Sequence, residues 1–202
     1  SVFGFGEPIK LLLEDAKVPH EYTQLTLSEM SEIKPKLIAA GNHFGAVPAI
    51  DFGDGEYNGA SIPLLRLLTR KLGKYVKYTN DEKEEYFLDS ASDFSIDWHL
   101  TAGETLFNQD DPTKREEYKT KVADKHYSRF DYVYGLHDGP YILGNEITYV
   151  DFLTYHIIDS DARNKCSELL KKYPNLIKLV EAIKNRPNLQ SHFKSLAAKE
   201  NQ

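Results

Sequence analysis

The spacing of hydrophobic residues predicts a helix near the start of the chain and mixed structure after it. In residues 7–17 the apolar side chains recur every three or four positions: Ile9, Leu12, Leu13 and Ala16. This is the spacing of one helix face, and Pro8 suits the first turn. Residues 20–27 alternate apolar and polar side chains, which is typical of a strand. Residues 29–40 predict a weaker helix that Pro35 interrupts.

The segment over residues 45–73 organises the first part of the chain. It contains a short apolar strand entered through Pro48, a Gly-Asp-Gly turn at residues 53–55 and a second short strand. A helix then begins at Ser61 and ends at Gly73. Together with the preceding elements, this segment predicts a small β/α layer.

Nearly all of the chain after a polar linker at residues 74–80 is predicted to be helical. One long helix covers residues 81–108, and a second covers residues 112–135 and closes at a glycine. We expect these two helices to pack as an antiparallel pair. Two shorter helices follow, and they open with Pro174 and Pro187.

The clearest local signal in the second half is a helix start at Thr148. Its hydroxyl can accept a hydrogen bond from the Asp151 N–H, while the Asp151 carboxylate reaches back to the Thr148 N–H. Ile147 and Phe152 stand where a hydrophobic staple joins residues across such a capping box. The sequence therefore predicts a helix from Thr148 to about Asp161.

Composition and charge argue against several classes of function. The 202-residue chain has a net charge of −6 and a pI of about 5.7, without a long basic run. Nucleic acids and anionic membranes are therefore poor partners. No apolar stretch approaches the roughly 18 residues that span a bilayer, and no secretory signal opens the chain. We expect a soluble, cytoplasmic protein.

Cysteine and histidine provide no metal or disulfide motif. The single cysteine, Cys166, excludes an internal disulfide framework and any CxxC arrangement. None of the seven histidines has a metal-binding spacing such as HExxH. We expect no metal site.

Two features of residues 45–73 suit a small acidic peptide. A cis bond between Val47 and Pro48 would turn the N–H and C=O of Val47 outward, where they can pair with an extended peptide. Ser61 stands where a helix N-cap belongs, so its hydroxyl and the free N–H groups behind it form a carboxylate site.

This segment resembles the glutathione-binding half of the cytosolic glutathione transferases. The resemblance rests on Val47-Pro48, Ser61 and Arg66-Leu67-Leu68, and the first helix, the capping box and the tail helices extend it over nearly the whole chain. It implies an α+β fold, with a thioredoxin-like β/α domain over residues 1–73 and an all-helical domain over residues 81–202. The first helix is most similar to the tyrosine-type subclasses (sigma, mu, pi and alpha).

The resemblance also implies an activity and a set of site residues. A glutathione transferase lowers the pKa of the glutathione thiol and directs the thiolate, its co-substrate, at a hydrophobic electrophile. The implied glutathione-binding residues are Ala46, Val47, Pro48, Ala60, Ser61, Asp93 and Lys36. The implied residues of the second-substrate pocket are Val2, Phe3, His99 and Gly103. Trp98 either lines this pocket with them or belongs to the core.

Two implied contacts have a plain structural alternative. Asp93 shares an acidic stripe with Asp89 and Asp97. It is expected either to reach the glutathione amino group across a homodimer or to be solvated, as we expect for Asp89. Phe44 either plugs into a pocket of the second subunit or covers its own sheet.

The residue that activates the thiol is not assigned within the chain. In the register of the tyrosine-type enzymes the activating tyrosine falls just before Ser1, and we expect the first strand of the domain to lie upstream as well. Ser1 is the alternative, since Ser1-Val2-Phe3-Gly4 resembles the Ser-Pro-Phe-Gly of serine-type enzymes.

Several positions depart from the family pattern. Ala60 replaces a usual Gln or Glu, Ala46 replaces a Lys or Gln, and Phe3 and Phe5 stand where many members have arginine. These departures leave two alternatives to conjugation open. One is a non-catalytic binding or structural protein of the same fold, and the other is a glutathione-dependent isomerase or peroxidase.

Overall fold

The computed structural model describes residues 4–76, 82–106 and 111–200. The chain divides into two compact units, Ser1–Lys74 and Tyr75–Gln202. Each unit has its own buried apolar side chains, such as Leu65 in the first and Phe152 in the second.

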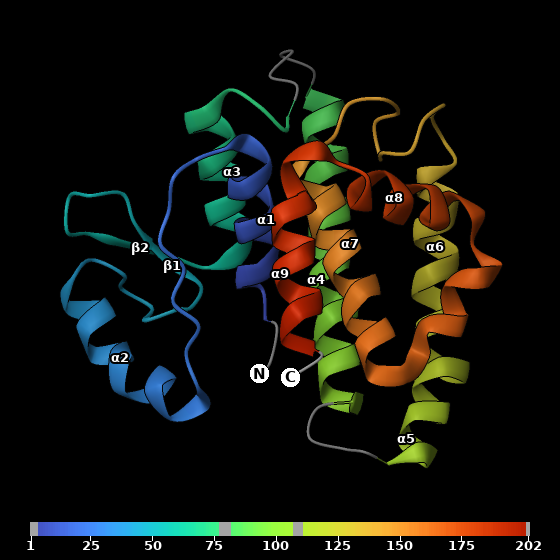
Figure 1. The fold of residues 1–202 in the computed structure, drawn as a ribbon, viewed down its shortest axis with the longest axis horizontal. Helices are drawn as coiled ribbons and strands as arrows, with labels where there is room; N and C mark the ends of the chain where they lie inside the picture. Colours follow the sequence, from blue (N-terminus) through green and yellow to red (C-terminus); the bar gives the residue numbers. More distant parts are fainter. Residues whose placement is uncertain (1–3, 77–81, 107–110, 201–202) are drawn as a thin grey trace. The chain divides into compact units, whose positions relative to one another are not determined.

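The first unit combines a β-hairpin with helices. Its elements are α1 (Gly6–Ala16), α2 (Leu27–Ala39), β1 (Ala49–Asp51), β2 (Tyr57–Gly59) and α3 (Ser61–Leu72). The strands pair antiparallel, with Ala49 opposite Gly59 and Asp51 opposite Tyr57. α3 contacts α1 and both strands, and Figure 1 shows the hairpin between α2 and the α1–α3 pair. The first helix, the hairpin and the helix from Ser61 are confirmed as parts of the predicted β/α layer.

The hairpin turn is closed by one carboxylate. Oδ1 of Asp51 accepts hydrogen bonds from the backbone N–H of Gly53 (2.7 Å) and of Gly55 (3.1 Å). These bonds hold the pKa of Asp51 below its usual value. The Gly-Asp-Gly turn therefore forms as the sequence predicts.

α2 begins earlier than predicted and continues through Pro35, so the prediction of an interruption there is wrong. A capping box at Thr26 accounts for the early start. The Thr26 N–H donates to the Glu29 carboxylate (2.7 Å), and the Glu29 N–H donates to the Thr26 hydroxyl (3.3 Å). This cap stabilises the first turn, and the helix continues past the proline to Ala39.

The strand predicted at residues 20–27 is also wrong. Residues 18–26 have no regular secondary structure, and Leu27 already belongs to α2. A strand requires a hydrogen-bonded neighbour, and among the described residues no segment forms a ladder with this stretch. Alternating side chains alone do not supply that neighbour.

The second unit is mainly helical in its described residues, apart from connecting segments such as residues 135–148. Its elements are α4 (Glu82–Leu106), α5 (Pro112–Glu117), η1 (Tyr118–Ala123), α6 (Asp124–Tyr134), α7 (Tyr149–Asp161), η2 (Ala162–Cys166), η3 (Ser167–Lys172), α8 (Pro174–Lys184), η4 (Pro187–Leu189) and α9 (Gln190–Glu200). α4 contacts α5, η1 and α7, and Figure 1 shows α4 antiparallel to the α5–α6 segment, as predicted. The π-helix η1 joins α5 to α6, so the second predicted long helix is continuous but changes pitch.

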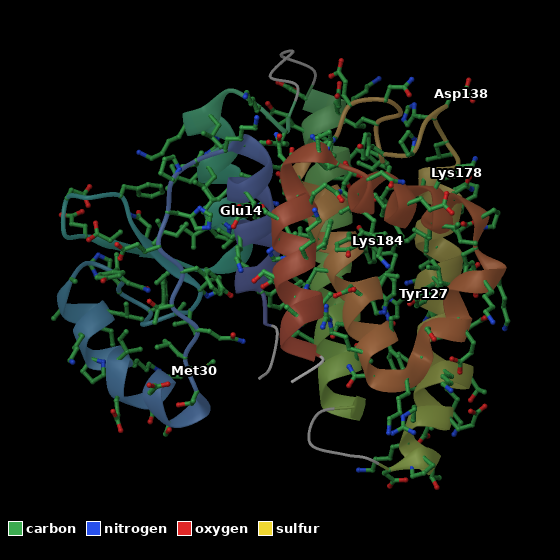
Figure 2. The ribbon with its side chains drawn as sticks, viewed as in Figure 1. Glu14, Met30, Tyr127, Asp138, Lys178 and Lys184 are labelled. Atoms are coloured by element: carbon green, nitrogen blue, oxygen red, sulfur yellow. The ribbon has the colours of Figure 1, made fainter. Side chains whose placement is uncertain are left out.

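A buried polar network joins three of these helices. Nε1 of Trp98 on α4 donates to the Tyr118 hydroxyl (3.0 Å), which in turn donates to the Asp161 carboxylate (2.9 Å). The ring of Tyr127, labelled on α6 in Figure 2, packs edge-on against Trp98 at 4.8 Å. Trp98 is fully buried, so it belongs to the helical core.

The capping box at the start of α7 is confirmed. The Thr148 N–H and hydroxyl both donate to Oδ2 of Asp151, at 2.6 and 2.9 Å. Its Oδ1 accepts a further bond from the Ile142 N–H (2.9 Å). The fully buried Asp151 thus fastens the preceding loop to α7, and burial raises its pKa to about 6.

Tyr75, which was predicted to lie in a polar linker, belongs to the second unit. It is buried, its carbonyl accepts from the Tyr149 N–H (3.0 Å), and its ring lies 5.5 Å from that of Phe152. Burial of an aromatic ring is favourable, so Tyr75 packs in the helical unit and does not stay in a solvated linker.

Candidate functional site

The segment that leads into β1 exposes the backbone of Val47. The bond between Val47 and Pro48 is cis, as predicted, and Val47 is 41% exposed. Within the described ranges, neither the N–H nor the C=O of Val47 has a hydrogen-bond partner. Unpaired backbone groups at a surface can pair with an extended peptide.

Asn42 is absent from the predicted site residues, yet it holds the neighbour of Val47. Its Nδ2 donates to the Ala46 carbonyl (2.7 Å), and its Oδ1 accepts from the Ala46 N–H (3.2 Å). The Ala46 N–H is therefore already engaged. The available signal in the sequence was the Gly41-Asn42 pair, because Asn in a turn often hydrogen-bonds nearby backbone.

The start of α3 differs from the prediction. The N-cap is Ala60, and Ser61 is the first helical residue, so the predicted N-cap role of Ser61 is wrong. The reason is that the Leu64 N–H donates to the Ala60 carbonyl (3.1 Å), which places the first helical turn one residue earlier. Ser61 still contributes its N–H and hydroxyl to the first turn of the helix.

One hydrogen bond brings four predicted residues together. The Ala60 N–H donates to the Pro48 carbonyl (3.1 Å). It therefore joins the exposed Val47–Pro48 segment to Ala60 and Ser61 at the start of α3. A backbone edge and a helix N-terminus then lie side by side within one unit.

The distribution of charge along α3 favours an anion at the N-terminal end of the helix. The first turn of α3 carries no acidic side chain, and the last turn carries Arg70 and Lys71. The helix dipole places partial positive charge at the N-terminus, where free N–H groups bind carboxylates. Lys36, the predicted contact for a second carboxylate, lies exposed in the last turn of α2.

The predicted dimer residue Phe44 is 87% exposed. A phenylalanine ring left in water covers little of its own sheet, and such a ring is suited to a partner's pocket. It lies between Asn42 and Gly45, whose backbone is held by a bond from the Gly45 N–H to the Asn42 carbonyl (2.8 Å).

Three predicted residues lie on α4 of the second unit. Asp93 is exposed. His99 is half-buried, its ring stacks on that of His156 at 5.6 Å, and burial lowers its pKa. A side chain at Gly103 would meet no atom within 4 Å, so the helix surface is open there.

Asp89 is exposed, as expected for a solvated residue, but it also has a partner on another helix. It accepts a hydrogen bond from the Tyr149 hydroxyl (3.2 Å), which links α4 to α7. The predicted residues Ser1, Val2 and Phe3 lie outside the described residues.

Neither a metal cluster nor a membrane span is found in the described part of the chain. No three His, Cys, Asp or Glu side chains there gather closely enough to hold a metal ion. No helix there is both long and apolar enough to cross a bilayer.

Comparison with known proteins identifies relatives over almost the full length. The chain is 27% identical over 201 residues to glutathione S-transferase P of Caenorhabditis elegans, which covers 98% of this chain and 90% of that protein. It is 25% identical over 201 residues to glutathione S-transferase Mu 2 of Mus musculus, with 95% and 87% covered.

Solved structures agree with this fold. The pi-class glutathione S-transferase of Onchocerca volvulus superposes with a TM-score of 0.84 at 23% identity, covering 98% of this chain and 90% of that one. The predicted fold, a thioredoxin-like unit followed by a helical one, is confirmed. The family model described as glutathione S-transferase, C-terminal domain, matches residues 96–196, half of the chain. The chain therefore belongs to the glutathione S-transferase family.

Proposed function

We propose that this protein is a glutathione transferase that directs the glutathione thiolate at hydrophobic electrophiles. The observation that carries the proposal is the hydrogen bond from the Ala60 N–H to the Pro48 carbonyl. It holds a peptide-binding edge at Val47 beside the anion-binding end of α3. Glutathione offers the complement, an extended tripeptide with carboxylates at both ends.

Each part of the tripeptide has an assigned contact. The N–H and C=O of Val47 pair with the cysteinyl residue, with Ala46 and Pro48 on either side. The γ-glutamyl carboxylate accepts hydrogen bonds at the start of α3 from the N–H and hydroxyl of Ser61, next to Ala60. Lys36 faces the glycine carboxylate, and Asp93 of a second copy faces the amino group.

The chemistry requires a thiolate next to an apolar pocket. A hydroxyl that donates a hydrogen bond to the sulfur lowers the pKa of the thiol, because hydrogen bonding to the charged form favours that form. On α4, His99 and Gly103 contribute to the pocket for the electrophile. Since burial lowers the pKa of His99, a neutral imidazole is compatible with a hydrophobic substrate.

The active form is a cytoplasmic homodimer in which Phe44 anchors the second subunit. Its 87% exposure supports this assignment, because buried aromatic anchors dominate the energy of many interfaces. The dimer also completes the site, since Asp93 acts across it.

The proposal is tested with the wild-type protein on glutathione-agarose and with a chloronitrobenzene as electrophile. We expect retention on the resin, elution by free glutathione, and formation of the thioether. Retention without turnover would instead favour a binding protein of the same fold. Loss of both would overturn the proposed function.

A further inference from the structure

Asn42 connects two parts of the first unit, the end of α2 and the loop before β1. Its backbone N–H donates to the Leu37 carbonyl (2.9 Å) at the end of α2. Its side chain forms the two bonds to Ala46, and it is only 5% exposed. One buried residue therefore ties the end of a helix to the loop that carries the glutathione-binding edge.

The orientation of the carboxamide is fixed by its partners. A backbone N–H can only donate and a carbonyl can only accept, so Ala46 determines which end of the amide is Oδ1 and which is Nδ2. The carboxamide also packs closely against Gly59 of β2. A Cβ added at Gly59 would lie only 2.7 Å from Cγ of Asn42. The carboxamide is therefore packed closely against β2 while it bonds to Ala46.

From this geometry we infer that Asn42 is a positioning residue for glutathione, a role that rests on the proposed function. Its carboxamide occupies both backbone groups of Ala46, as a paired strand would. Val47 comes directly after Ala46, and its own N–H and C=O are left free for a ligand among the described residues. The loop is held in its binding conformation before glutathione arrives, which reduces the entropy lost on binding.

The carboxamide is specific for this task. Leucine has a similar volume but offers neither donor nor acceptor, so both groups of Ala46 would be left without their buried partner. Ionised aspartate keeps an acceptor for the Ala46 N–H, but it sets a second acceptor against the Ala46 carbonyl. Only a neutral side chain with one donor and one acceptor satisfies both.

The test is the Kd of glutathione, measured by titration calorimetry, for the wild type and for Asn42→Leu. We expect the Kd to rise about tenfold, which corresponds to the net free energy of one to two lost hydrogen bonds. The matched control is Asp131→Ala in the second unit. It removes a side chain that also holds backbone, through bonds from the Asn175 N–H (2.8 Å) and the Leu176 N–H (3.2 Å). Asp131→Ala should lower the Tm and leave the Kd unchanged.

Asn42→Asp provides a second readout, which also serves if Asn42→Leu does not fold. Burial raises the pKa of a carboxyl, and the protonated acid again offers one donor and one acceptor. The ratio of variant to wild-type Kd should therefore fall towards one between about pH 8 and about pH 5.

The outcomes separate this inference from the proposed function. If the wild type binds no glutathione, both are overturned. If the wild type binds and both Asn42 variants bind equally well at every pH, only the role of Asn42 is overturned. A loss shared by Asp131→Ala would also overturn it, because general destabilisation would then explain the effect.

Discussion

At the scale of single residues, Ala60 has the least favourable backbone of the site. Its φ of 75° and ψ of 136° lie in a region that residues with a Cβ rarely adopt. The two bonds of its backbone, from the Leu64 N–H and to the Pro48 carbonyl, hold it there. Strain of this kind persists at functional sites because the surrounding contacts impose it.

Ala60→Gly should therefore stabilise the protein. Glycine adopts positive φ without a Cβ clash, and we expect a gain of about 1 kcal/mol, or roughly 2–4 °C in Tm. Thermal unfolding followed by circular dichroism measures the change. The control is Ala39→Gly, in the last turn of α2, which should lower the Tm. Equal losses in the two variants would show that Ala60 is not strained.

At the scale of elements, Asp161 joins the helices of the second unit. It lies at the end of α7 and accepts a hydrogen bond from the Tyr118 hydroxyl of η1. The same hydroxyl accepts a hydrogen bond from Nε1 of Trp98 on α4. Burial is the main reason that its pKa rises to about 7, and the tyrosine hydrogen bonds oppose that rise. The network therefore contains an acid that titrates near neutrality.

This pKa predicts how stability depends on pH. Because the folded-state pKa lies above the unfolded value of about 4, the folded state binds the extra proton. The contribution of this proton to the free energy of unfolding is therefore full below about pH 4, and it is lost as pH rises through about 7. Asp161→Asn removes this titration. The Tm of the variant minus that of the wild type should increase from about pH 5 to about pH 8. A constant difference would show that Asp161 does not titrate in this range.

At the scale of the whole molecule, the proposed dimer depends on an aromatic residue of the first unit. Phe44→Ser should weaken dimerisation roughly thirtyfold, since truncation of an interface anchor costs about 2 kcal/mol. Sedimentation velocity over a range of concentrations measures this change. Tyr132→Ser is the control, because Tyr132 is also exposed (70%) but is not assigned to the interface. A Phe44 variant that dimerises like the wild type would contradict the assignment.

Local sequence signals predicted most of the elements. The helical spacing of residues 7–17, the Gly-Asp-Gly turn and the box at Thr148 each act over a few residues, so each was readable before the structure. The segment at residues 20–27 failed for the opposite reason, because its pattern depends on a neighbouring strand. Asp161 and Asn42 were also missed, since their importance comes from partners on other elements.

The sequence by itself determined the family, the order of helices and the hairpin, because periodicity, caps and turns depend on residues close together in the chain. Only the tertiary structure decided which residue caps α3, which side chain holds Ala46 and where the polar groups of the helical core find partners. Those outcomes depend on burial and on hydrogen bonds between segments distant in sequence. The energy of a buried polar group is set by its three-dimensional surroundings, and no local pattern specifies them.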